Sequence, residues 1–105
     1  MQQVKWQWQF PVYDPTYYLE QMPRAIDPTV AHIVLRLDLS ASVDVDQVDD
    51  VTLSRVTLNW GSGNKVVSPD FEVSYQDEFT IQDYLASPEV REHALAALHL
   101  SGEAA

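Results

Sequence analysis

The longest regular alternation of apolar and polar residues in the chain covers Ala31–Val45. Nearly every second side chain there is apolar, and those between are mostly polar or charged. Because strand side chains point alternately to two faces, the pattern predicts one long strand with a buried face and a solvated face. Val4–Phe10 alternates in the same way, with Trp6 and Trp8 on the apolar face, and predicts an earlier strand.

Val51–Trp60 predicts a further strand, but its apolar residues change parity partway along. A β-bulge, one extra residue near Ser54 and Arg55, would restore the register. The turn-forming residues 61–64 then predict a hairpin that returns along Lys65–Ser68. The connections are too short for helical crossovers, so we expect a mostly antiparallel sheet.

Two short segments precede the long strand. Asp14 is a favoured helix N-cap and Pro15 a favoured first helical residue, which predicts a short helix over Pro15–Gln21. Pro23–Thr29 contains two prolines and predicts a loop.

After the hairpin, the pattern changes from extended to helical. Phe71, Val73 and Tyr75 share one face of a short extended segment. Thr80 has an acidic residue three positions later, Asp83, and this capping-box spacing predicts a helix through Ala86.

Ser87–Glu89 predicts the start of the terminal helix. Four apolar residues of that helix fall on one stripe: Val90, Ala94, Ala97 and Leu98. Gly102 is expected to end it, leaving residues 101–105 as a flexible tail.

These elements predict an α+β fold, a mostly antiparallel sheet of four to five strands with a C-terminal helix packed on it. A chain of 105 residues is long enough for one core, so residues 1–100 are expected to form a single domain.

The charge and the cysteine content of the chain exclude several classes of function. Sixteen Asp and Glu residues stand against six Lys and Arg, and a net charge of −10 repels nucleic acids and anionic lipids. Solubility explains this acidity about as well as a basic partner does. The chain has no cysteine, which excludes disulfides and thiolate chemistry. No stretch reaches membrane-spanning length and no signal-peptide pattern is seen, so we expect a cytoplasmic protein.

Candidate chemistry is sparse. We find no phosphate-binding glycine loop, nucleophile elbow or metalloprotease motif, so neither an enzyme nor a cofactor is expected. His93 and His99 are six positions apart and do not share a helix face, which argues against zinc. His93 is expected to pair with Glu89 on the surface.

Four aspartates cluster between the two central predicted strands, and such a cluster can in principle gather calcium ligands: Asp44, Asp46, Asp49 and Asp50. The segment lacks the glycine and the distal glutamate of a calcium loop. A solvated acidic loop without metal is therefore the favoured interpretation.

The aromatic row of Trp6, Trp8 and Phe10 could stack sugars or bases, but a core position is favoured for residues on one strand face. Three tyrosines in the loop and short helix that follow are better candidates for a protein-binding hot spot: Tyr13, Tyr17 and Tyr18.

Together these observations favour a non-catalytic protein-binding module with an acidic face. One possibility is an inhibitor or DNA mimic, of the kind phages and mobile elements encode, that occupies a basic surface of a nucleic-acid-processing protein. The expected contact residues are Asp44, Asp46, Asp49, Asp50, Asp77, Glu78, Asp83, Tyr17 and Tyr18.

Two alternatives remain open. The chain can be a structural subunit of a virion or other assembly, a homo-oligomer that self-associates through the unusually long 31–45 strand. It can also be a small-molecule or carbohydrate binder with Trp6, Trp8 and Trp60 lining a pocket.

Overall fold

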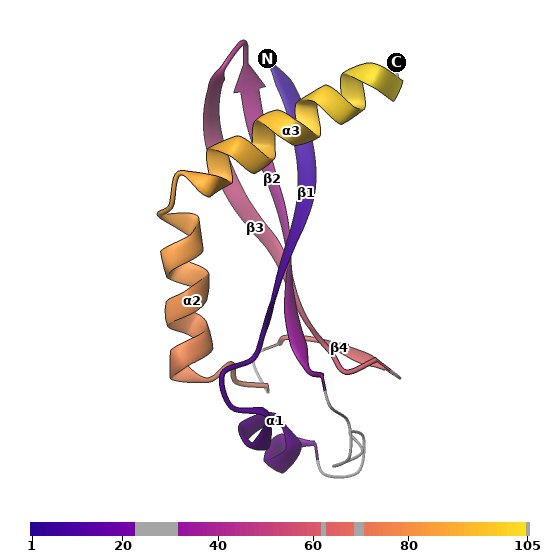
Figure 1. Cartoon of the computed structure of the whole chain (residues 1–105), viewed down its shortest axis with the longest axis vertical. Helices are drawn as coiled ribbons and strands as arrows, with labels where there is room; N and C mark the ends of the chain where they lie inside the picture. The colour runs from indigo at the N-terminus through magenta and orange to yellow at the C-terminus, as the bar shows by residue number, and fades with distance from the viewer. Residues whose placement is uncertain (23–31, 62, 69–70, 105) are drawn as a thin grey trace.

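The computed structural model describes residues 1–22, 32–61, 63–68 and 71–104. Across these ranges, four strands form one antiparallel sheet in the order β1-β2-β3-β4 (Figure 1). The elements are β1 (Gln2–Pro11), α1 (Pro15–Gln21), β2 (Val34–Asp44), β3 (Gln47–Asn59), β4 (Asn64–Val66), α2 (Tyr75–Leu85) and α3 (Glu89–Ala104). The predicted α+β fold with a C-terminal helix on an antiparallel sheet is confirmed. The loop predicted for Pro23–Thr29 lies outside the described residues.

Strand β2 is an interior strand that is paired along nearly its whole length on both sides. It pairs with β1 from Val34 to Val43 and with β3 from Val34 to Asp44. The predicted alternation is confirmed, because its inward-facing residues are all buried: Leu35, Leu37, Leu39, Ala41 and Val43. The prediction that the strand continues to Val45 is wrong, since that residue lies in the following turn.

The parity change in β3 is a bulge, as predicted. Arg55 pairs with Asp38, but Leu53 pairs with Leu39, so Ser54 is the extra residue. A second irregularity follows between Ser40 and Ser42 of β2. These shifts restore the inward direction of the apolar side chains of β3, which would otherwise turn to the polar face.

The connection between β2 and β3 is a tight turn and not a loop, which corrects the prediction for the aspartate cluster. Asp44 pairs with Gln47, so only Val45 and Asp46 lie between the strands. Val45 has a φ of 60°, a backbone conformation that β-branched residues rarely adopt, and its side chain is 86% exposed. Asp49 and Asp50 therefore belong to β3 and project from a strand.

The predicted hairpin after β3 is confirmed, although its return strand is Asn64–Val66 and not Lys65–Ser68. Thr57 pairs with Val66 and Asn59 with Asn64, and the Trp60 N–H donates to the Gly63 carbonyl at 3.1 Å. A Cβ on Gly63 would lie 2.9 Å from the Trp60 ring, so this close approach requires glycine.

Helix α1 forms over the predicted residues, with the Asp14 side chain accepting a hydrogen bond from the Thr16 N–H at 3.1 Å. Helix α2 begins earlier than predicted. Its N-cap is Ser74, whose hydroxyl accepts a hydrogen bond from the Asp77 N–H at 3.3 Å. Tyr75 is consequently the first helical residue and is exposed, so the prediction that it belongs to a short extended segment is wrong.

Helix α3 starts at Glu89 as predicted and packs across β1, β2 and β3 (Figure 1). Ala94 and Ala97 contact Val4, Ala41 and Val43, where small side chains let the helix approach the sheet closely. The helix runs to Ala104, so the prediction that a glycine at 102 ends it is wrong. Flexibility of residues 101–105 remains a prediction.

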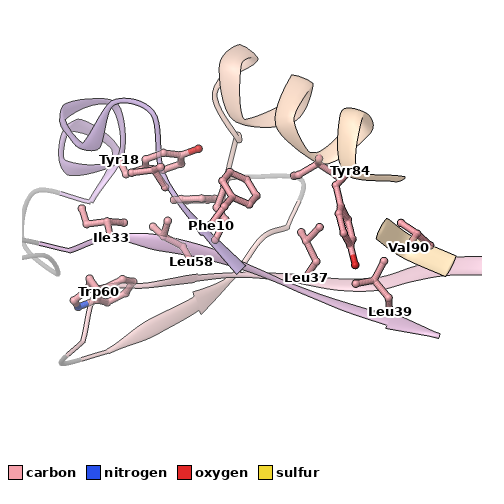
Figure 2. Packing of buried hydrophobic residues seen from close by; sticks show 13 residues of the cluster. Phe10, Tyr18, Ile33, Leu37, Leu39, Leu58, Trp60, Tyr84 and Val90 are labelled. Atoms are coloured by element: carbon pink, nitrogen blue, oxygen red, sulfur yellow. The ribbon is translucent and has the colours of Figure 1, made fainter. Parts of the chain in front are cut away.

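The main core lies between the sheet and helices α1 and α2. Figure 2 shows Phe10, Tyr18 and Leu58 packed in its centre, with Trp60 at one end and Tyr84 toward the other. The helices of the described chain lie on this side of the sheet (Figures 1 and 2). The opposite face, with the polar side chains of β1, β2 and β3, is left without a helix.

The strained turn gives a test of the hairpin geometry. Val45→Gly should raise the free energy of unfolding by about 1 kcal/mol, because glycine adopts a positive φ without steric cost. Thermal denaturation should show a melting temperature higher by a few degrees. Val51→Gly is the matched control, since it removes an exposed valine from within β3 and should lower stability. Equal destabilisation by both changes would contradict the turn geometry.

Candidate functional site

The predicted acidic contact residues lie on two separate parts of the molecule. Asp44, Asp46, Asp49 and Asp50 are all exposed around the β2–β3 hairpin. Glu78 and Asp83 are exposed on α2, which lies toward the other end of the elongated sheet (Figure 1). The long axis of the molecule measures 47 Å, so the sequence-predicted set is not one compact surface.

Two of the predicted contact residues are buried. Tyr18 is fully inaccessible and Asp77 is only 1% exposed, so neither can touch a partner in this fold. Tyr17 is half-buried, with its ring edge-on to that of Tyr18 at a centroid distance of 5.1 Å.

The Asp77 carboxylate is a structural tie between three segments. Its Oδ1 accepts a hydrogen bond from the Tyr13 N–H at 2.9 Å, and its Oδ2 accepts one from the Tyr18 hydroxyl at 2.5 Å. The Tyr18 hydroxyl in turn accepts a hydrogen bond from the Ser74 N–H at 3.1 Å. Both carboxylate oxygens are thus engaged, and the negative charge lies favourably in the first turn of α2. Sequence reasoning missed this role, although Ser74 and Asp77 have the capping-box spacing.

A second polar chain joins β1 to α2 and α3. The Trp6 indole N–H donates to the Tyr84 hydroxyl at 3.0 Å, and that hydroxyl lies 2.7 Å from His93 Nδ1. The Trp8 ring stacks on Tyr84 with centroids 3.9 Å apart and an interplanar angle of 3°. The partner of His93 is therefore Tyr84, and the predicted surface pair with Glu89 is not observed.

The tryptophans do not form the three-sided pocket that one alternative required. Trp6 and Trp8 border a groove of about 450 Å³ with His93, whereas Trp60 is buried in the main core. The indoles of the groove are half-buried and contact Tyr84, so the core position predicted for the aromatic row holds fully only for Phe10.

The outer face of α2 carries two aromatic side chains that are exposed to solvent. Tyr75 is 84% exposed and Phe79 is 66% exposed, and they are one helical turn apart on the same face. Glu78 and Asp83 are exposed beside them on the same helix. Tyr13, also exposed, is held near the first turn of α2 by its hydrogen bond to the carboxylate of Asp77. Phe79 escaped the sequence analysis because α2 was expected to begin after it.

The acidic hairpin is tethered to α3 by a single cation. Arg91 Nη2 donates to the Asp46 carbonyl at 2.9 Å and lies 4.0 Å from the Asp46 carboxylate. Both side chains are more than half exposed, and exposed ion pairs contribute little to stability. The remaining carboxylates of the hairpin therefore face solvent.

Metal ligation and membrane crossing find no support among the described residues. No group of three or more His, Asp or Glu side chains there is arranged to hold a metal ion, and this includes the aspartates of the hairpin. No described helix is both long enough and apolar enough to cross a membrane.

Replacing the buried carboxylate tests its structural role. Asp77→Asn should lower the free energy of unfolding by about 2–3 kcal/mol, because an amide nitrogen would face the Tyr18 hydroxyl in place of an acceptor oxygen. Urea denaturation monitored by circular dichroism measures the change. Asp83→Asn, an exposed change on the same helix, should stay within about 0.5 kcal/mol of the wild type. If both changes lowered the free energy of unfolding by a similarly small amount, the structural role of the Asp77 carboxylate would be contradicted.

The buried tyrosines make stability depend on alkaline pH. Burial, together with the hydrogen bond to Asp77, raises the pKa of Tyr18 above its ordinary value of 10.0, and burial also raises the pKa of Tyr84. The folded state keeps these protons at a pH where the unfolded chain loses them, so stability should fall as pH rises above about 10.

Urea midpoints measured from neutral to alkaline pH test this dependence. Tyr18→Phe should show a shallower decline than the wild type, although it starts from a lower stability. Tyr75→Phe, which removes an exposed hydroxyl, should keep the wild-type slope. A Tyr18→Phe slope equal to that of the wild type would show that this hydroxyl does not titrate as described.

No protein-family model matches this chain, and no curated protein or solved structure is significantly similar to it.

Proposed function

We propose that the protein is a non-catalytic binding module that docks on a basic surface of another protein through the outer face of α2. The observation that carries the proposal is the pair of large exposed aromatic side chains, Tyr75 and Phe79. Aromatic residues are enriched among the few side chains that dominate binding energy at protein interfaces. Burying them against a partner would remove their apolar surface from water.

The charges around these aromatics indicate the chemistry of the partner. Glu78 and Asp83 border Tyr75 and Phe79, and the chain as a whole has a net charge of −10. A complementary surface would present an apolar recess for the rings and Lys or Arg side chains at its rim. Nucleic-acid-processing proteins carry such basic surfaces, and we place them first among candidate partners in the cytoplasm.

The β2–β3 hairpin has a different place in this proposal. Its four aspartates are exposed, and residues 44–50 contain no aromatic side chain. The exposed apolar side chain at the turn is the aliphatic Val45. Exposed charges at the rim of an interface mainly raise the association rate. We therefore assign anchoring to α2 and long-range attraction of the partner to the hairpin.

The anchoring role is tested by a pair of matched variants. Tyr75→Ala combined with Phe79→Ala should weaken binding about 1,000-fold, since interface anchors contribute about 2 kcal/mol or more each. Val51→Ala with Val66→Ala removes exposed apolar groups elsewhere and should bind like the wild type. Proteins captured from host lysate by all three forms are compared by mass spectrometry, and the affinity of the differential partner is measured by calorimetry. Equal affinity of wild type and the α2 variant would refute the α2 site.

The role of the β2–β3 hairpin is tested by measuring the rates of association with the same partner and dissociation from it. Asp44→Lys, Asp46→Lys and Asp49→Lys combined should slow association and flatten its dependence on salt, with little change in dissociation. Surface plasmon resonance at low and high salt separates the two rates. Unchanged association would show that these carboxylates do not attract the partner.

Self-association into an assembly would have to use a strand other than the predicted 31–45 strand. The 31–45 strand was expected to pair with a neighbouring chain, but β2 is paired on both sides and has no free edge. Strand β1 is an edge strand of the described sheet, with Lys5 as its one charged residue. An edge strand of ten residues with a single charge favours pairing between copies. A discrete oligomer in sedimentation at high salt would support assembly through β1, and a monomer would support the binding module.

A further inference from the structure

The helix-free face of the sheet gathers the scarce cations of this acidic protein. The chain has six Lys and Arg residues, and one of them, Arg24, lies outside the described ranges. Three of the other five line one concavity of about 810 Å³: Lys5, Arg36 and Arg55. The gathering stands out because eleven of the described carboxylates are exposed but do not line this concavity: Asp14, Glu20, Asp44, Asp46, Asp49, Asp50, Glu72, Glu78, Asp83, Glu89 and Glu92.

The strand register builds this concavity from three neighbouring strands. Asp38 of β2 lies between Gln7 of β1 and Arg55 of β3. Arg36 and Lys5 occupy the two adjacent rows of the same face, one on either side of this row, because side chains two positions apart share a face. The three cations therefore surround one shared patch of the sheet.

The bulge in β3 contributes two side chains to the same patch. Ser54 is the extra residue, and both it and Arg55 line the concavity. The Ser54 hydroxyl is fixed by donating to the Asp38 carbonyl at 2.9 Å. Bulges commonly redirect side chains beside binding sites, and here the bulge brings a hydroxyl and a guanidinium together.

The charges of the patch are only partly neutralised. Asp38 is its one lining carboxylate and lies 3.9 Å from Arg36 Nε, a distance too long for a hydrogen bond. Lys5 and Arg55 form no ion pair with any carboxylate in the described ranges. Three positive charges against one negative leave the patch with a local excess of cation.

Unsatisfied buried donors lie at the same place. Arg36 Nε is buried without a hydrogen-bond partner among the described groups, and so is Thr57 Oγ1, which belongs to the residue paired with Arg36 across the strands. A buried donor without an acceptor is rare and costly. The Arg36 side chain as a whole is 33% exposed. Because a guanidinium readily binds two oxygens of a phosphate, its exposed part can receive an oxyanion at this patch.

We propose that this concave face binds a small phosphorylated sugar. Arg36, Arg55 and Lys5 hold the phosphate oxygens, while Asp38 and Gln7 hydrogen-bond the sugar hydroxyls. A phosphate monoester matches the excess positive charge, whereas a long nucleic acid would meet the surrounding carboxylates. A base has no ring to stack on here, since Trp6, the one aromatic residue at the border, uses its indole on the opposite face to bond Tyr84. The site is independent of the α2 surface.

Nuclear magnetic resonance titration of the full chain at low salt tests the site with three probes: glucose 6-phosphate, inorganic phosphate and glucose. Glucose 6-phosphate should shift the backbone amide signals of Gln7, Asp38 and Arg55, and should bind more tightly than inorganic phosphate. Glucose should leave them unchanged. Absence of shifts with both phosphates, or shifts confined to other residues, would overturn the site. Equal affinity for the two phosphates would overturn the assignment of a sugar ligand.

Matched charge removals separate the patch from general charge effects. Arg55→Gln should weaken glucose 6-phosphate binding about 10-fold or more, because it removes a charged hydrogen-bond donor. Lys65→Gln removes the same charge from β4, outside the concavity, and should bind like the wild type. Thermal melting of both variants verifies that they fold. Equal weakening by both changes would overturn the proposal.

A second copy of the chain is the competing occupant, since its acidic hairpin also carries oxyanions. Sedimentation without ligand distinguishes this case. A monomer across the concentrations used for titration supports a free site for the sugar phosphate. Concentration-dependent dimers, with the same amide signals shifting on dilution, would overturn the proposal in favour of self-association.

Discussion

The burial of the Asp77 carboxylate is the constraint on which the helical half of the molecule depends. A carboxylate that is 1% exposed must have its acceptors satisfied, and the groups that satisfy it come from the segment after β1 and from α1. The first turn of α2 is thereby fixed against two segments remote in sequence. The same turn directs Tyr75 outward, so the exposed aromatic face follows from the buried acid on the other side of the helix.

The two faces of the sheet carry different kinds of side chain. Apolar side chains of β1, β2 and β3 meet the helices, and the bulge at Ser54 preserves that direction despite the change of parity. Carboxylates collect on the helices and the hairpin, while Lys5, Arg36 and Arg55 remain on the open face. The chain has a net charge of −10, but the open face of the sheet carries a local excess of positive charge.

Local patterns were sufficient for most elements, because alternation and capping depend on near neighbours. The strands, the short helix at Pro15–Gln21 and the bulge followed from them. The start of α2 did not, since Ser74 and Thr80 offer similar capping spacings and the choice depends on Tyr18, which is 56 positions from Ser74. The open-face cluster was equally inaccessible, because it requires the register between strands. Tyr18 was predicted to contact a partner but is buried, because its burial depends on contacts with Ser74 and Asp77, which are distant in sequence.

The order of the strands has a consequence for how the chain folds. Each strand pairs with the strand next in sequence, and β2 and β3 are joined by only two residues. The entropy of closing such a hairpin is small, so it can form early and offer both of its edges as a template. Strands β1 and β4 then add from either side. Helix α3, which contacts all three long strands, can gain its full packing only after the sheet exists, which makes its docking a late step in folding.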